Sequence, residues 1–160
     1  MRARALIAAG KTDEALKEVR LCLAGLPGDI DGPIHFVPDL EKHGRKKEAD
    51  EVFGQVFRHY DQVCRAYPKS AQHHNSLAWL AVCCRRQLDA ALEHARKAVE
   101  LAPDTASYLD TLAEIHYQRG DKAEALRLMK KCIELDPRND YFPKQVKRFK
   151  APGPPSETPR

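Results

Sequence analysis

Four prolines divide most of the chain into stretches of similar length. They are Pro27, Pro68, Pro103 and Pro137, and they lie 41, 35 and 34 residues apart. Each one follows a run of helical periodicity, and proline ends a helix because it lacks the backbone N–H donor. A period of about 20 to 50 residues is typical of chains that stack one small structural unit on the next. The spacing therefore predicts an array of repeated units.

The unit over residues 105–137 has the pattern of two helices joined by a tight turn. A stripe at spacings of three and four marks the first helix, at Leu109, Leu112, Ala113 and His116. Gly120 is expected to end that helix, since glycine readily adopts positive φ. Asp121 and Glu124 then have the spacing of a capping box at the start of the second helix.

The same signals recur, with decreasing fidelity, over residues 70–103, 31–68 and 1–27. The unit 70–103 lacks the glycine and has one extra residue in its turn. In the degenerate unit 31–68 the proline comes seven residues late, so we expect a second helix that is two turns longer. Pro38 is expected to kink or shorten the first helix of that unit. The segment 1–27 retains mostly the second helix of a unit.

Because residues 1–27 form only part of a unit, we expect the chain to be the C-terminal piece of a longer array, or its start to have been assigned late. A single repeat cannot bury its apolar face alone. We therefore expect a partly exposed apolar face, formed by Leu6, Ile7, Leu16 and Leu23. Such a face would support self-association through residues 1–27.

The residues after the last unit predict an end cap. Residues 139–150 have the pattern of a short amphipathic helix. Its apolar side is expected to cover the last unit with Tyr141, Phe142, Val146 and Phe149. Its basic side is expected to face water with Lys144, Lys147, Arg148 and Lys150. Residues 151–160 contain four prolines and no large apolar side chain, which predicts a disordered tail.

The unit 105–137 resembles the tetratricopeptide repeat (TPR) family through that family's Leu-Ala, Gly-Asp, Ala-Leu and terminal Asp-Pro signals, and the unit 70–103 resembles it nearly as well. The resemblance implies an all-α fold, an α-solenoid of antiparallel helix pairs in a right-handed superhelix, here with a C-terminal capping helix. It also implies a concave groove, lined by the first helix of each pair, that binds a peptide or a partner protein. The chain would then be a scaffold or adaptor.

The groove candidates follow from the edge of each first helix that lies opposite its apolar stripe. They are Asn75, Trp79, Val82, Asp110, Glu114, Tyr117 and Gln118. Trp79, the only tryptophan, fits either a ligand anchor or a packing residue, and both interpretations stay open. Some family members clamp an acidic peptide with Lys, Asn and Arg. That pattern is missing, and the acidic residues favour a basic or neutral peptide.

Charge and cysteine content narrow the remaining function classes. Residues 138–160 hold six Lys or Arg and two Asp or Glu, which accounts for the whole net charge of +4. A general nucleic-acid surface is therefore not indicated. Five cysteines without a CxxC motif favour reduced thiols in the cytoplasm. No apolar stretch approaches the ~20 residues of a membrane helix.

Neither catalysis nor a metal site is predicted. The sequence contains no GxSxG, HExxH or phosphate-binding glycine loop, so we expect no enzyme activity, catalytic residue or cofactor. Nine or ten residues of helix, about 14 Å at ~1.5 Å per residue, separate His73 and His74 from Cys83 and Cys84. They cannot share one ion, and His116 is expected to be a core histidine. An alternative is a regulatory part of a larger protein, such as a kinase or transferase.

Overall fold

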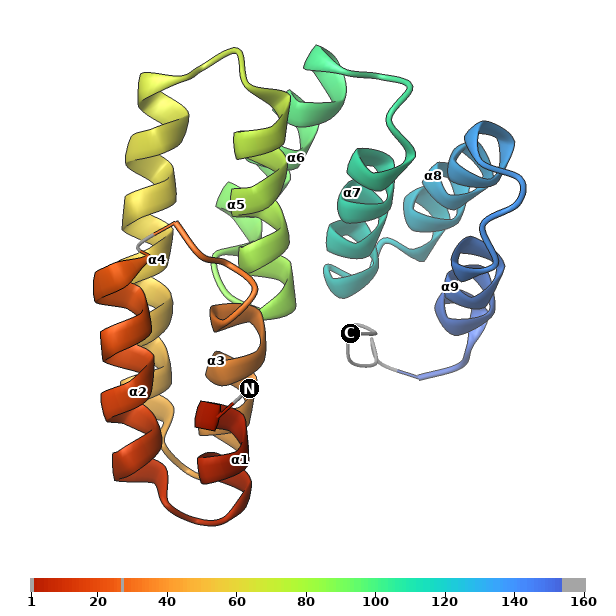
Figure 1. Cartoon of the computed structure of the whole chain (residues 1–160). Helices are drawn as coiled ribbons and strands as arrows, with labels where there is room; N and C mark the ends of the chain where they lie inside the picture. The colour runs from red at the N-terminus through yellow and green to blue at the C-terminus, as the bar shows by residue number, and fades with distance from the viewer. Residues whose placement is uncertain (1, 27, 154–160) are drawn as a thin grey trace. The chain divides into compact units, whose positions relative to one another are not determined.

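Every helix-forming segment predicted above is helical in the computed structural model, which describes residues 2–26 and 28–153. Within those ranges the chain forms helices and connecting turns and no strand (Figure 1). The helices are α1 (Arg2–Ala8), α2 (Thr12–Gly25), α3 (Pro33–Lys42), α4 (Lys46–Ala66), α5 (Ala71–Cys83), α6 (Leu88–Leu101), α7 (Ala106–Gln118), α8 (Lys122–Leu135) and α9 (Tyr141–Lys150). None of these helices is long and apolar enough to cross a membrane. The predicted disordered tail lies outside the described residues from position 154 onward.

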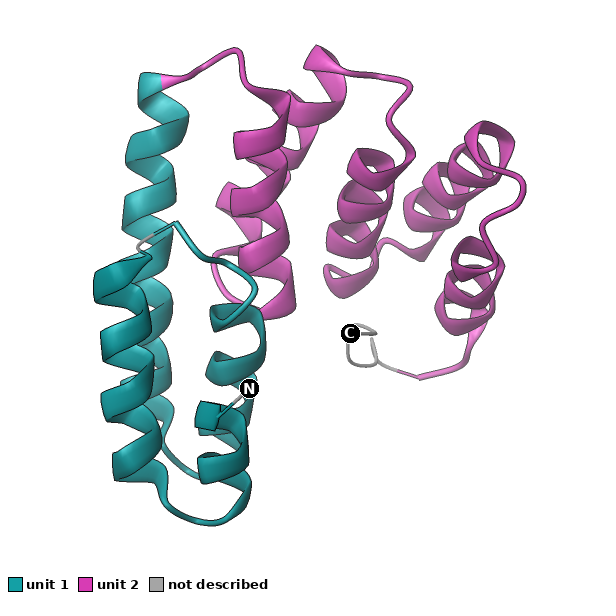
Figure 2. Cartoon of the chain, viewed as in Figure 1, with its two compact units in different colours: residues 1–66 teal, residues 67–160 magenta. Residues whose placement is uncertain are grey.

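The chain divides into two compact units, residues 1–66 and residues 67–160 (Figure 2). Unit 1 contains α1 to α4, and unit 2 contains α5 to α9. In unit 1, α1 packs against α2 and α3, and α3 packs against α4. In unit 2, α5 pairs with α6 and α7 pairs with α8, while α9 packs against α8. Unit 1 therefore consists of two helix pairs, and unit 2 consists of two helix pairs followed by the single helix α9, as the repeat pattern implies.

The expected open apolar face at the N-terminus is wrong for three of its four residues. Ile7, Leu16 and Leu23 are buried, and Leu6 is half-buried. The reason is that α1, although only seven residues long, packs against both α2 and α3. The apolar residue that α2 leaves open is instead Leu21, whose exposed fraction is 70%.

Unit 1 shows the expected departures in helix length. Helix α4 has 21 residues, whereas α2, α6 and α8 have 14 each. Helix α3 has 10 residues, three fewer than α5 or α7, and it continues through Pro38 as far as Lys42. Proline in a helix interior removes one backbone hydrogen bond. The helix nevertheless buries Val37 and Leu40 completely, and this burial opposes the cost of the proline.

Small residues set the spacing of the helix pairs in unit 2. Alanine is fully buried on both members of each pair, at Ala78, Ala81, Ala91, Ala95, Ala98, Ala113 and Ala125. The turn between α5 and α6 lacks glycine, and Arg85 and Gln87 take positive φ values of 52° and 54° there. Gly120 has a φ of 88° in the turn of the next pair. Since a side chain at positive φ costs about 1 kcal/mol, the glycine-free turn is the more strained of the two.

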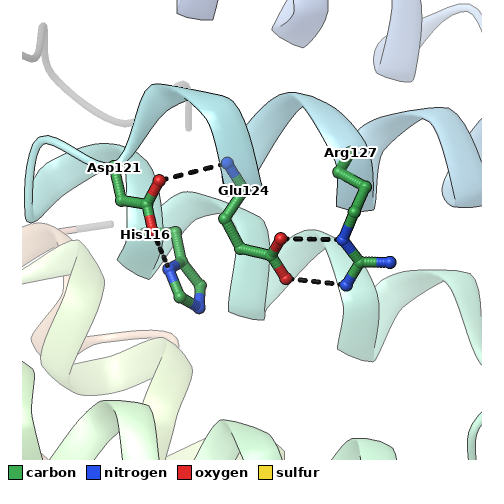
Figure 3. Close-up of polar contacts among 4 residues, drawn as sticks. All are labelled: His116, Asp121, Glu124 and Arg127. Atoms are coloured by element: carbon green, nitrogen blue, oxygen red, sulfur yellow. Dashed lines mark hydrogen bonds and ion pairs between the residues drawn. The ribbon is translucent and has the colours of Figure 1, made fainter.

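The predicted cap of α8 is confirmed at Asp121, whose carboxylate accepts a hydrogen bond from the backbone N–H of Glu124 at 3.1 Å (Figure 3). The second half of the predicted capping box is wrong. The Glu124 carboxylate instead accepts two hydrogen bonds of 2.7 Å from Arg127. The His116 side chain is mostly covered, with an exposed fraction of 12%, and it also makes a polar contact. Its Nδ1 lies 3.2 Å from the second oxygen of Asp121, so the histidine joins the end of α7 to the cap of α8.

Candidate interaction site

The residues predicted to line a groove lie on two neighbouring helices of unit 2. Asn75, Trp79 and Val82 are on α5, and the other four are on α7, which packs against α5. The side chain of Gln118 links the residues on α5 with those on α7. The Gln118 amide nitrogen donates to the backbone oxygen of Val82 at 3.2 Å and to Glu114 at 2.9 Å. The structure therefore brings the predicted residues of both helices into one region.

Burial separates these candidates into two groups. Asn75, Trp79, Asp110 and Gln118 are half-buried, so part of each is open to solvent. Val82, Glu114 and Tyr117 are buried, with exposed fractions of 0, 2 and 2%. A side chain that is already covered cannot meet a ligand from solvent in this conformation. The buried group is therefore unavailable to a partner unless the elements that cover it move.

Helix α9 covers two of the predicted residues on α7, Tyr117 and Glu114. The rings of Tyr117 and Phe149 are stacked, with centroids 4.4 Å apart and an angle of 20° between their planes. The guanidinium carbon of Arg148 lies 4.9 Å from the centroid of each ring. Aromatic stacking and cation–π contacts both add to the hydrophobic gain of burying these rings. Helix α9 therefore packs against Tyr117, a side chain that was predicted to contact a ligand.

A buried ion pair holds the same contact. The Arg148 guanidinium donates to the Glu114 carboxylate, and their side chains are 14% and 3% exposed. Arg148 also donates from Nε to the Gln145 side-chain oxygen at 2.8 Å. The expectation that Arg148 faces water is therefore wrong, while Lys144, Lys147 and Lys150 are exposed as expected. Removing one partner of such a pair would leave the other as a buried charge, which is strongly destabilising.

Asp110 adds a second carboxyl group to this contact. The pKa of Asp110 is raised to about 7, mainly by burial and then by the Glu114 carboxylate, while the charge of Arg148 lowers it. Burial is also the main cause that raises the pKa of the Tyr141 phenol on α9. Burial and then the charge of Asp110 raise the pKa of the Cys132 thiol on α8 to about 12. Two carboxyl groups therefore share the charge of Arg148, and the Asp110 carboxyl is partly protonated near neutral pH.

The histidines that were weighed as metal ligands are engaged in other contacts. The Nδ1 atom of His74 lies 2.8 Å from Nδ1 of His94, and its Nε2 lies 3.2 Å from the backbone oxygen of Pro68. Since a carbonyl oxygen only accepts, His74 donates from Nε2, and His94 donates from Nδ1 to His74. The ring of His73 packs against Tyr67. Sequence reasoning missed His94, because nothing local indicates that α6 delivers it to α5.

The sequence did contain a signal for the α9 contact. Arg148 and Gln145 follow Tyr141 at spacings of seven and four, so all three share a face of the helix. Phe149 lies directly beside that face. An arginine on the apolar side of a cap, together with two acidic residues one helical turn apart at Asp110 and Glu114, indicates an ion pair across the two helices.

Comparisons with known proteins identify one repeat directly. Residues 106–139 match the family model of the tetratricopeptide repeat. These residues cover α7, α8 and the turn that follows.

Several solved structures, two of them described as TPR proteins, are similar over most of the chain. A thermophilic TPR protein of Thermus thermophilus has a TM-score of 0.61 and 19% identity, over 92% of this chain and 77% of that one. YrrB, a TPR protein described as having an unusual peptide-binding site, has a TM-score of 0.52 and 13% identity, over 91% and 88%. MamA has a TM-score of 0.50 and 15% identity, over 91% and 80%. At these identities the likeness shows the fold alone, an all-α array of helical repeats, and the family match shows a tetratricopeptide repeat at residues 106–139.

Proposed function

We propose that the chain is a protein-interaction module that binds a peptide segment of a partner protein along α5 and α7 of unit 2. The observation that supports this best is the row of half-buried first-helix residues on two packed helices. Asn75 and Trp79 belong to it on α5, and Gln118 belongs to it on α7. An amide side chain offers both a donor and an acceptor to a peptide backbone, and tryptophan is a frequent anchor at interfaces.

The rigidity of the two helices favours such a role. Leu77, Leu80, Leu109 and Ile115 are almost fully buried in unit 2, and the Gln118 side chain bonds α7 to the last turn of α5. A surface that is ordered before binding loses less conformational entropy when it meets its ligand. A similar use is described for YrrB, which has a peptide-binding site. We extend only the general role, peptide binding, to this chain.

A pair of matched substitutions tests the proposal. Ser107 is exposed on α7, on the side that also carries Asp110 and Gln118, so Ser107→Arg places a large charged group in the proposed site. Ala123→Arg places the same group on α8, at a position that is also exposed. The full chain and both variants are immobilised, and bound proteins from the source cells are quantified by mass spectrometry.

We expect the wild type and Ala123→Arg to retain the same partner. We expect Ser107→Arg to retain at least about tenfold less of it, because a loss of ~1.4 kcal/mol already produces that change. Circular dichroism confirms that both variants keep the helix content of the wild type. Equal retention by all three proteins would place the interaction elsewhere on the chain.

A further inference from the structure

We propose that the side of α7 that faces α9 is a binding surface for a basic amphipathic helix of a partner protein, and that α9 is its resident intramolecular occupant. We call this side the acidic face and define it by Asp110, Glu114 and Tyr117. The inference rests on the proposed function, because it assigns the chemistry of the partner to the α7 half of the same row. In this proposal α9 and the partner helix compete for the same face of α7.

The charges on the acidic face are not balanced by α9. Asp110 and Glu114 are one helical turn apart on α7, and both lie near Arg148. The three lysines of α9 lie on its exposed side, so they do not neutralise these two carboxyl groups. The buried Glu114 and the half-buried Asp110 therefore share one guanidinium, and the partial loss of water around Asp110 is unfavourable unless this carboxyl holds a proton. An occupant with two cations would neutralise both.

A second unfavourable feature of this contact is a buried polar side chain on α9. The Gln145 side chain is buried, and it interacts with the Tyr141 phenol, but its Nε2 donor has no acceptor with good hydrogen-bond geometry among the residues that the structure describes. Gln145 is between Tyr141 and Arg148 on the face that α9 turns toward α7. A buried donor without an acceptor is unfavourable. A lysine at this position would replace that donor with a cation beside two carboxyl groups.

The contacts of α9 define the partner that would fit better. Its Arg148 pairs with Glu114, and its Phe149 stacks on Tyr117. The partner helix is therefore expected to carry an arginine followed directly by an aromatic residue, with a second cation three residues before the arginine. Because α9 is tethered, it benefits from a high effective concentration. A partner can displace it only through an added interaction, and the second cation supplies one.

A labelled peptide provides the test. It copies residues 138–151 with Gln145→Lys, so it presents the arginine, the aromatic residue and the second cation. Fluorescence anisotropy measures its binding to the full chain and to the full-length variant Phe149→Ala, in which α9 loses its stacking partner on Tyr117. We expect saturable binding to Phe149→Ala and binding at least about tenfold weaker to the wild type, because α9 occupies the site in the latter.

Two further substitutions in the Phe149→Ala chain locate the peptide. Glu114→Gln removes the carboxylate that pairs with Arg148, and Glu134→Gln makes the same chemical change at an exposed position of α8. We expect the first to weaken peptide binding at least about tenfold, as is typical of a lost buried charge pair, and the second to leave it unchanged. Absence of binding to the folded Phe149→Ala chain, or equal binding by both double variants, overturns the proposal.

Hydrogen exchange on the wild type gives an answer that does not depend on the folding of Phe149→Ala. With the peptide in large excess, we expect the amides of α9, Tyr141–Lys150, to exchange faster than without it. Unchanged exchange at saturating peptide also overturns the proposal. If the peptide fails while partner retention still depends on Ser107, the basic-helix assignment is wrong and the proposed function stands.

Discussion

Asp110→Asn tests the electrostatics of the α7–α9 contact with a small change of shape. The substitution keeps the size of the side chain and removes its ionisation. In the wild type, the pKa of this carboxyl is raised from 3.8 to about 7, mainly by burial. The folded state therefore holds a proton that the unfolded chain has released between about pH 4 and pH 7. Unfolding then releases a proton, so the contribution of Asp110 to stability falls as pH rises through this range.

The size of the effect follows from the two pKa values. At ~1.36 kcal/mol per pKa unit, a change from 3.8 to about 7 costs the folded state about 4 kcal/mol once Asp110 is fully ionised. At pH 5 the same linkage relation gives a cost of only about 2 kcal/mol. We therefore expect Asp110→Asn to stabilise unit 2 by about 2 kcal/mol at pH 5 and by about 4 kcal/mol at pH 8. These are upper values, because opening of α9 admits water to the carboxyl group.

Urea unfolding followed by tryptophan fluorescence measures this difference. Trp79 is the only tryptophan and lies on α5, so its emission reports on unit 2. The free energies of unfolding of the wild type and the variant are compared at several pH values from 5 to 8. Groups that titrate equally in both proteins cancel in the comparison. The control is Asp104→Asn, because the Asp104 side chain is 80% exposed, and we expect it to have a small effect that does not vary with pH.

The contrary result is a difference between wild type and Asp110→Asn that stays constant from pH 5 to pH 8. It would mean that Asp110 is ionised in the folded chain at pH 5 and that its carboxyl is hydrated. The inference that the carboxyl groups of Asp110 and Glu114 share one guanidinium would then fail. A variant that is less stable than the wild type at pH 8 would contradict the same argument more strongly.

Two other substitutions test the local structure. Asp121→Ala removes the hydrogen bond to the backbone N–H of Glu124, and we expect it to lower the free energy of unfolding by about 1 kcal/mol in urea titrations. A change below the error of the measurement would show that the cap is not formed. Leu16→Ala and Leu21→Ala make the same truncation on α2 at exposed fractions of 5% and 70%. In thermal unfolding we expect a loss of about 2 to 5 kcal/mol for the first and under about 0.5 kcal/mol for the second, and equal losses would contradict the burial of α2.

Local signals were sufficient to predict the repeat architecture. Gly120 and Asp121 mark a helix end and a helix start through their own backbone preferences, and the structure has a positive φ at one and a side-chain cap at the other. These preferences depend on the nearest few residues, so the sequence displays them directly. The extra length of α4 could be predicted for the same reason, since its apolar spacing continues past the usual position of the proline.

Contacts between distant residues were harder to predict. Glu114 and Arg148 are 34 residues apart, and His74 and His94 are 20 apart. Helical periodicity assigns each residue to a face of its own helix, but it does not show which helix covers that face. The burial of Ile7 by α2 and α3 was missed for this reason. The predicted groove residues remain a proposal, and α9 covers part of their row.

The ring contact between Tyr117 and Phe149 tests the central claim most directly, because it exists only if α9 rests on α7. At a centroid separation of 4.4 Å, protons of the two rings are close enough for strong nuclear Overhauser effects. With selectively labelled tyrosine and phenylalanine in the full chain at pH 6, we expect these cross-peaks between Tyr117 and Phe149. Their absence, in a chain whose other aromatic contacts such as Phe53–Phe57 are observed, would mean that α9 does not occupy the acidic face.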